Sequence, residues 1–141
     1  MARRQFALAL HTLILLARTP GCATSEDLAG SVNTHSSGVR RMLATLGQAG
    51  IVHAAEGRDG GYRLAHPPDR ITLKDIYRAV ADEPLIPCNR PVSPHCPVSA
   101  ALGPALNAIV ADAEARFQDA LERRTLADIA DSVDGTPSWL H

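Results

Sequence analysis

The stretch SVNTHSSGVRRML, residues 31–43, decides the fold. It joins the end of one expected helix, residues 25–31, to the start of another, residues 34–49. We expect Ser25 to cap the first helix and Asn33 or Thr34 to cap the second. Four apolar residues recur at helical spacing in the second helix and predict one buried stripe: Val39, Met42, Leu43 and Leu46.

The flanking sequence extends this helix pair into a larger unit. Residues 3–18 form an amphipathic helix with two apolar faces, one of which can meet a partner chain. After the pair, a strand over 51–55 and a returning strand over 62–64 enclose the glycine-rich turn EGRDGG. Thr72 and Asp75 then form a capping box for a further short helix, which turns Leu73, Ile76 and Val80 inward.

The remainder of the chain has three parts. Five prolines lie between positions 84 and 97 and forbid a regular helix there. A single long helix is expected over 99–133, with a stripe too long for an 80-residue head to bury, so it predicts pairing with a second chain. The predicted domains are a winged helix-turn-helix, a cysteine-containing loop, a dimerisation helix and a tail of no assigned role, at 1–83, 84–98, 99–133 and 134–141. The predicted fold is mainly α with a small β-hairpin wing.

A short helix, a tight link, a polar-faced helix and a hairpin are typical of winged helix-turn-helix DNA binding. The N-terminal residues of the second helix would reach base edges in the major groove: Thr34, His35, Ser36 and Ser37. Arg40 and Arg41 would reach phosphates, and one can read a guanine edge. In the wing we expect contacts from Arg58, Tyr62 and Arg63, with Gly60 and Gly61 allowing close approach to phosphate and tolerating a positive φ.

Charge and hydropathy narrow the function class. Residues 1–80 carry a balance of +4 and residues 81–141 one of −5, which fits a DNA-contacting head and an acidic remainder. No run of 18 apolar residues and no signal-peptide cleavage pattern is present, so we expect a cytoplasmic protein without a membrane span. No nucleophile–base pair, metal-ligand helix or phosphate loop is apparent, so we expect no enzyme.

Four motifs resemble the Rrf2 family of bacterial regulators: residues 31–43, LGQAGIV at 46–52, GGYRLA at 60–65 and PDRITLKDIYRAV at 68–80. The resemblance covers about residues 3–131. It implies a homodimer that binds a palindromic operator in double-stranded DNA, usually as a repressor, with the first and the long helix forming the interface. It also adds Arg3 and Arg4 as phosphate contacts.

The cysteines leave the sensed signal open. Iron–sulfur members of the family carry three closely spaced cysteines, whereas this loop has only Cys88 and Cys96, and Cys22 lies far away in sequence. We favour a thiol switch at Cys88 and Cys96, with no cofactor. The alternatives are an iron–sulfur cluster completed by His95 or by the partner chain, zinc at Cys88, His95 and Cys96, or cysteines that only pack. A winged module that binds protein instead of DNA is the competing function.

Overall fold

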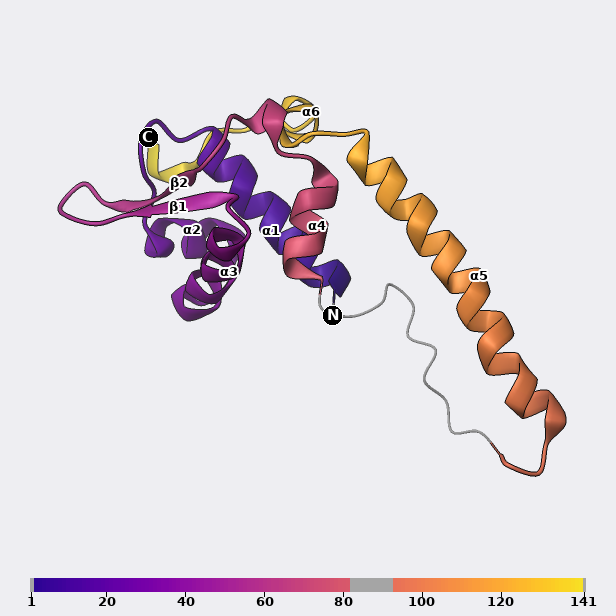
Figure 1. Cartoon of the computed structure of the whole chain (residues 1–141). Helices are drawn as coiled ribbons and strands as arrows, with labels where there is room; N and C mark the ends of the chain where they lie inside the picture. The colour runs from indigo at the N-terminus through magenta and orange to yellow at the C-terminus, as the bar shows by residue number, and fades with distance from the viewer. Residues whose placement is uncertain (1, 82–92, 141) are drawn as a thin grey trace.

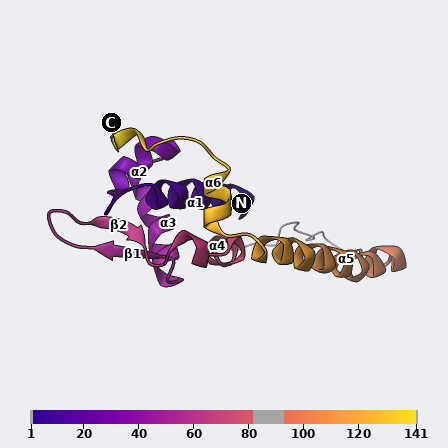
Figure 2. The ribbon, with the colours of Figure 1, turned by 90° about the horizontal axis from the view of Figure 1, so that it is seen from above.

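The computed structural model describes residues 2–81 and 93–140, whose elements are shown in Figure 1. Helices α1 to α4 and a hairpin form a head, from which helix α5 projects as a long arm (Figures 1 and 2). The bounds are α1 Ala2–Ala17, α2 Ser25–Val32, α3 Ser36–Gln48, β1 Val52–Ala55, β2 Gly61–Leu64, η1 Pro68–Arg70, α4 Leu73–Val80, α5 Pro97–Glu122, α6 Leu126–Asp131 and η2 Ser138–Leu140. The predicted fold class is confirmed.

The core of the head is formed by apolar side chains from all four of its helices. The predicted stripe of α3 and the inward face of α4 are both buried, as expected. Burying one leucine contributes roughly 1.5–3 kcal/mol, so this cluster fixes how α3 sits against its neighbours. Its fully buried members include Leu13 of α1, Leu28 of α2, Val39, Leu43 and Leu46 of α3, and Ile76 of α4.

The N-cap of helix α2 lies one residue earlier than predicted, because it is Thr24 and not Ser25. The Thr24 hydroxyl accepts the Asp27 amide at 3.1 Å, and the Asp27 carboxylate accepts the Thr24 amide at 3.2 Å. This reciprocal pair satisfies two otherwise unpaired helix-end donors. The same arrangement was predicted for α4 and is confirmed at Thr72 and Asp75.

The link between α2 and α3 also differs from the prediction. Asn33 ends α2 in the left-handed conformation, with a φ of 54°, and does not cap α3. Neither does Thr34. The N-cap position of α3 belongs to His35, whose side chain makes no capping hydrogen bond. The left-handed residue turns the chain sharply, and asparagine tolerates this conformation better than most residues.

The hairpin has the predicted antiparallel pairing, in a register that places Val52 opposite Leu64 and Ala55 opposite Gly61. Its second strand is also paired on its other side. Ala23, in the link between α1 and α2, donates its amide to the Tyr62 carbonyl at 3.0 Å and accepts the Tyr62 amide at 2.8 Å. The hairpin is therefore anchored directly to the helix-turn-helix.

The long helix ends earlier than predicted. It stops at Glu122, and a separate helix, α6, begins after Thr125. Thr125 and Asp128 form a third capping box, at 3.2 and 2.8 Å. The chain around Thr125 is also bonded to the start of α4: the Leu73 amide donates to Arg124 and the Leu126 amide to Ile71. The capping box and these hydrogen bonds together stabilise two separate helices, α5 and α6, relative to one continuous helix.

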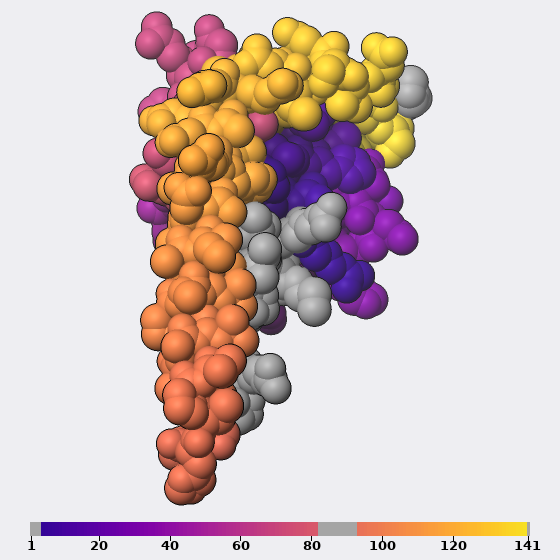
Figure 3. All heavy atoms as spheres, turned by 90° about the vertical axis from the view of Figure 1, so that its right-hand side faces the viewer, coloured from indigo at the N-terminus to yellow at the C-terminus, as the bar shows by residue number. Residues whose placement is uncertain are grey.

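One apolar stripe runs along α5 and becomes exposed beyond the head. Phe117 packs on the core and Leu121 is buried, where the arm meets the head. Further out, the same stripe is open to solvent, and Figure 3 shows that part of α5 extending beyond the head. Its exposed members are Val98, Leu102, Leu106 and Ile109. Among the described helices, none is both long and apolar enough to cross a bilayer.

Tyr77 joins the arm to the head. Its ring makes edge-on contacts with Phe6 of α1 at 5.5 Å and with Phe117 of α5 at 5.2 Å between centroids. Its hydroxyl donates to the Glu114 carboxylate at 3.5 Å. Burial, followed by the negative charge of Glu114, raises the pKa of Tyr77 above its usual value of 10.0. Both effects disfavour the tyrosinate.

This raised pKa predicts a loss of stability in alkali. The phenol's contribution is fully present below the unfolded-state pKa, about 10, and is lost as pH rises through the higher folded-state pKa. We expect Tyr77→Phe to flatten that alkaline decline, while retaining the aromatic packing. Urea unfolding of Tyr77→Phe and Tyr62→Phe across this pH range would measure it. Equal alkaline declines in the two variants would contradict the assignment to Tyr77.

Candidate nucleic-acid interface

The outward face of α3 is polar and basic. Ser37, Arg40 and Arg41 are exposed on the side opposite the buried stripe, so the core presents them to solvent. Neither arginine forms an ion pair with any residue that the structure describes. Both guanidinium groups are therefore available for phosphate oxygens or a base edge.

The start of α3 supplies the remaining predicted contacts on this helix. His35 is exposed and its imidazole is not used for capping, whereas Thr34 and Ser36 are half-buried. Their position at the N-terminus of α3 is where winged helix-turn-helix proteins first meet base edges. Four of the six predicted residues therefore lie on α3, and Thr34 and His35 lie directly before it.

The wing divides into exposed and internal residues. Arg58 in the turn and Arg63 on β2 are exposed, without an ion pair in the described parts of the chain. Tyr62 is half-buried and packs on the core, and its main chain bonds to Ala23. Of these three predicted residues, the two arginines therefore present exposed positive charge.

The two wing glycines also make close contacts within the chain that the sequence did not predict. A Cβ on Gly60 would lie 2.4 Å from the Ala55 carbonyl oxygen, and one on Gly61 would lie 2.5 Å from the Ala23 carbonyl oxygen. Gly61 also has a φ of 142°, whereas Gly60 has no positive φ. These positions require glycine for contacts within the chain, whatever approaches from outside.

The hairpin register adds a residue that was not predicted. His53 on β1 lies directly opposite Arg63 on β2, and both are exposed. Residues paired in this way project from the same face of a hairpin. The alternation of side chains along the strand predicts that His53 is exposed. Only the observed register places it beside Arg63. Arg4 is exposed on α1, and the side chain of Arg3 lies outside the described part of the structure.

The predicted sensor is described only in part. Cys96 is exposed and occupies the N-cap position of α5, and Cys88 lies outside the described residues. Cys22 is half-buried in the link between α1 and α2, on the wing side of the head, whereas α5 begins at the far tip of the arm (Figures 1 and 2). Within residues 2–81 and 93–140, no group of three or more His, Cys, Asp or Glu could hold a metal ion. The predicted ligand sets include Cys88, so they lie partly outside the described residues.

Comparison with known proteins identifies the family. The Rrf2 family, described as an iron-dependent transcriptional regulator, matches residues 2–132. YwnA of Bacillus subtilis, named as an HTH-type transcriptional regulator, is 32% identical over 92% of this chain and 96% of YwnA. The HTH-type transcriptional regulator NsrR of Bacillus licheniformis is 29% identical over 89% of this chain and 88% of NsrR.

Solved structures agree with this match. CymR, the global cysteine regulator of B. subtilis, superposes with a TM-score of 0.64 at 25% identity, covering 92% of this chain and 95% of CymR. IscR of T. potens shares the fold with a TM-score of 0.68 at 20% identity, covering 92% of this chain and 85% of IscR. The chain therefore belongs to the Rrf2 family and is a DNA-binding transcriptional regulator, not an enzyme.

Proposed function

We propose that this regulator binds a palindromic operator as a homodimer, with α3 of each subunit in the major groove and the hairpin beside it. The observation that carries the proposal is the outward face of α3, where Ser37, Arg40 and Arg41 are exposed and no described residue neutralises the arginines. Phosphate contacts position such a helix, and its base contacts select the sequence. Arg58 and Arg63 of the wing would add backbone contacts. We expect repression where the operator overlaps a promoter.

A salt titration tests this proposal against a protein-binding role for the head. Binding to a duplex from the promoter region of its own gene would be followed by fluorescence anisotropy, with a scrambled duplex as the control. Phosphate contacts release counterions, so affinity should fall steeply as salt rises and should favour the promoter duplex. A flat salt dependence without sequence preference would support the protein-interaction module instead.

The exposed stripe of α5 supports the homodimer. Apolar residues at four positions along the arm are uncovered in the single chain, and a second α5 would bury them in a helix–helix seam. Two-fold pairing would also give two reading helices related as the halves of a palindrome.

Introducing charge into that seam should dissociate the dimer. Ile109 is 66% exposed, so Ile109→Glu should leave the head folded while placing a carboxylate in the apolar contact. Ala111 lies on the opposite side of α5 and is exposed, which makes Ala111→Glu a matched control. Sedimentation velocity should show monomers for Ile109→Glu and dimers for the control. A dimeric Ile109→Glu variant would place the interface elsewhere.

We also propose a thiol input at Cys88 and Cys96. This proposal is supported by Cys96, which is exposed at the N-cap position of α5. Oxidation of its thiol would alter the start of the helix that would join the two subunits. In a disulfide, two thiols give up two protons and two electrons to an oxidant such as hydrogen peroxide, which is reduced to water. Gel shifts with reduced and peroxide-treated protein should show loss of DNA binding on oxidation, and Cys96→Ser should be insensitive. Redox-independent binding by the unaltered chain would exclude the switch.

The Rrf2 family is described as iron-dependent, so the side chains that could bind a metal ion near Cys96 are relevant. His95 and Cys96 are exposed next to each other, but no third described donor joins them. A structural zinc site takes four ligands, and a typical cluster takes four cysteines. No step of the proposed switch passes through a metal.

A further inference from the structure

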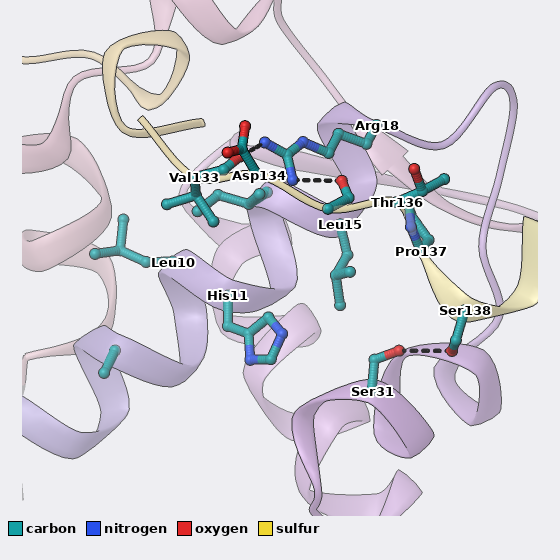
Figure 4. A pocket seen from close by; sticks show the side chains of 13 residues that line it. Leu10, His11, Leu15, Arg18, Ser31, Val133, Asp134, Thr136, Pro137 and Ser138 are labelled. Atoms are coloured by element: carbon teal, nitrogen blue, oxygen red, sulfur yellow. Dashed lines mark hydrogen bonds between the residues drawn. The ribbon is translucent and has the colours of Figure 1, made fainter. Parts of the chain in front are cut away.

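Residues 132–140, here called the strap, run from the end of α6 past α1 to α2 (Figures 1 and 4). No role for this tail is evident from the sequence. Its residues nevertheless contact the head at two separate points, one just beyond the end of α1 and one on α2. The strap therefore links the end of the chain to the helices that precede α3.

Arg18, just beyond the end of α1, holds the first point. Its guanidinium donates to the carbonyls of Ala130 and Gly135, each at 2.6 Å, and to that of Val133. These acceptors lie at and after the last turn of α6, where the helix dipole favours a cation. No carboxylate among the described residues pairs with Arg18. Its charge is directed at main-chain oxygens of the strap and of α6.

The second point lies on α2. The Ser138 hydroxyl is 3.2 Å from the Ser31 hydroxyl (Figure 4). Pro137 is fully buried, and Trp139 packs against the core. Ser31 belongs to the last turn of α2 and lies two residues before Asn33, the left-handed residue that turns the chain into α3. A contact at Ser31 therefore acts on the segment that sets the direction of α3.

Residues 132–136 of the strap are exposed, whereas Pro137 is buried. A groove of about 510 Å³ separates the strap from α1 and is lined mainly by Leu10, His11, Ile14 and Leu15 on the helix side (Figure 4). The strap is held by the Arg18 hydrogen bonds, by the Ser31–Ser138 contact and by the packing of Pro137 and Trp139. Its exposed part buries little apolar surface, and segments with few buried apolar contacts open at low free-energy cost.

We propose that the docked strap positions the helix-turn-helix for DNA, and that Arg18 is its principal positioning residue. Docking at Arg18 and Ser31 restrains the end of α2 and so favours one orientation of α3. Release leaves the head folded but widens the range of α3 orientations, which weakens DNA binding. The inference rests on the proposed role of α3 in the major groove.

Strap docking and DNA binding are thermodynamically linked, so the effect of each on the other can be measured. If strap docking raises DNA affinity by some factor, DNA must favour strap docking by the same factor. Trp139 is the single tryptophan of the chain and lies in the strap, so its emission reports docking without a label. A merely structural role for Arg18 would change the melting temperature but would not make tryptophan emission depend on DNA.

The experiment uses the full chain with Arg18→Met and Ser138→Ala, and Ser138→Thr as the variant that keeps the hydroxyl. Arg123→Met removes an equal charge from an exposed site at the end of α5 and serves as the control. Tryptophan emission, acrylamide quenching and affinity for the promoter duplex would be measured well below the melting temperature, with circular dichroism to confirm folding.

We expect Arg18→Met to shift Trp139 emission to the red, to increase quenching and to weaken DNA binding about tenfold, a usual size for coupling between distinct sites. Adding the duplex should shift the emission of this variant back toward the blue. Ser138→Ala should act in the same direction more weakly, and Ser138→Thr and Arg123→Met should match the unaltered chain. A released strap with unchanged DNA affinity would overturn the proposal, as would unshifted emission in Arg18→Met. Failure of the unaltered chain to bind DNA would instead reject the proposed function of α3, a result seen before any variant is made.

Discussion

Gly61→Ala is expected to lower the free energy of unfolding by about 2–4 kcal/mol, because two independent constraints require glycine there. Its φ of 142° is disfavoured for any residue with a Cβ. That Cβ would also lie 2.5 Å from the Ala23 carbonyl oxygen and 3.3 Å from the Thr24 amide nitrogen. Both neighbours are backbone, so relief requires the hairpin to separate from the link between α1 and α2. Urea unfolding followed by circular dichroism would measure the loss.

Gly30→Ala is the matched control. Gly30 lies inside α2, has no positive φ and offers open space where a Cβ would be built. Alanine has a higher helix propensity, so this change should raise the free energy of unfolding by about 0.5–1 kcal/mol. Opposite signs for the same substitution would show that the cost at Gly61 comes from its tertiary contact. Equal stability of Gly61→Ala and the unaltered chain would mean that β2 is not anchored to Ala23.

The double variant Arg40→Ala, Arg41→Ala should weaken binding to the promoter duplex by about 10- to 100-fold. Removing one phosphate contact should also reduce the slope of log affinity against log salt by about 1. Both residues are exposed and make no described ion pair, so their replacement should leave the fold intact. The single variants would separate the two roles. The one that reads a base edge should relax sequence preference, whereas the one that binds phosphate should weaken all duplexes alike.

Arg70→Ala provides the control for net charge, because Arg70 is exposed in η1 and outside the proposed interface. It should retain nearly full affinity at moderate salt. Fluorescence anisotropy with promoter and scrambled duplexes at several salt concentrations would make all of these comparisons. Unchanged affinity of the double variant would place the DNA contacts on another surface than α3.

Local sequence signals determined most of the head. Helical spacing identified the buried stripe of α3, and Thr72 with Asp75 correctly began α4. Two of the misplaced boundaries carried the same signal. Thr24 precedes Asp27 by three residues, as Thr125 precedes Asp128, and both pairs form capping boxes. Both capping boxes could therefore have been predicted, because the threonine and the aspartate that form each box are present in the sequence at the required spacing.

Contacts between segments that are distant in the sequence could not be predicted from local sequence patterns. The partners that decide the role of Gly61, the pairing of His53 with Arg63 and the docking of the strap by Arg18 lie on other elements. Arg18 binds main-chain carbonyls, which every residue possesses, so no side-chain pattern marks its acceptors. By itself the sequence determined the family, the winged helix-turn-helix and the chemical character of α3, because these depend on periodicity and short motifs. Only the tertiary structure decided which glycines are irreplaceable and where the tail docks, because steric exclusion and main-chain hydrogen bonding depend on which backbones meet.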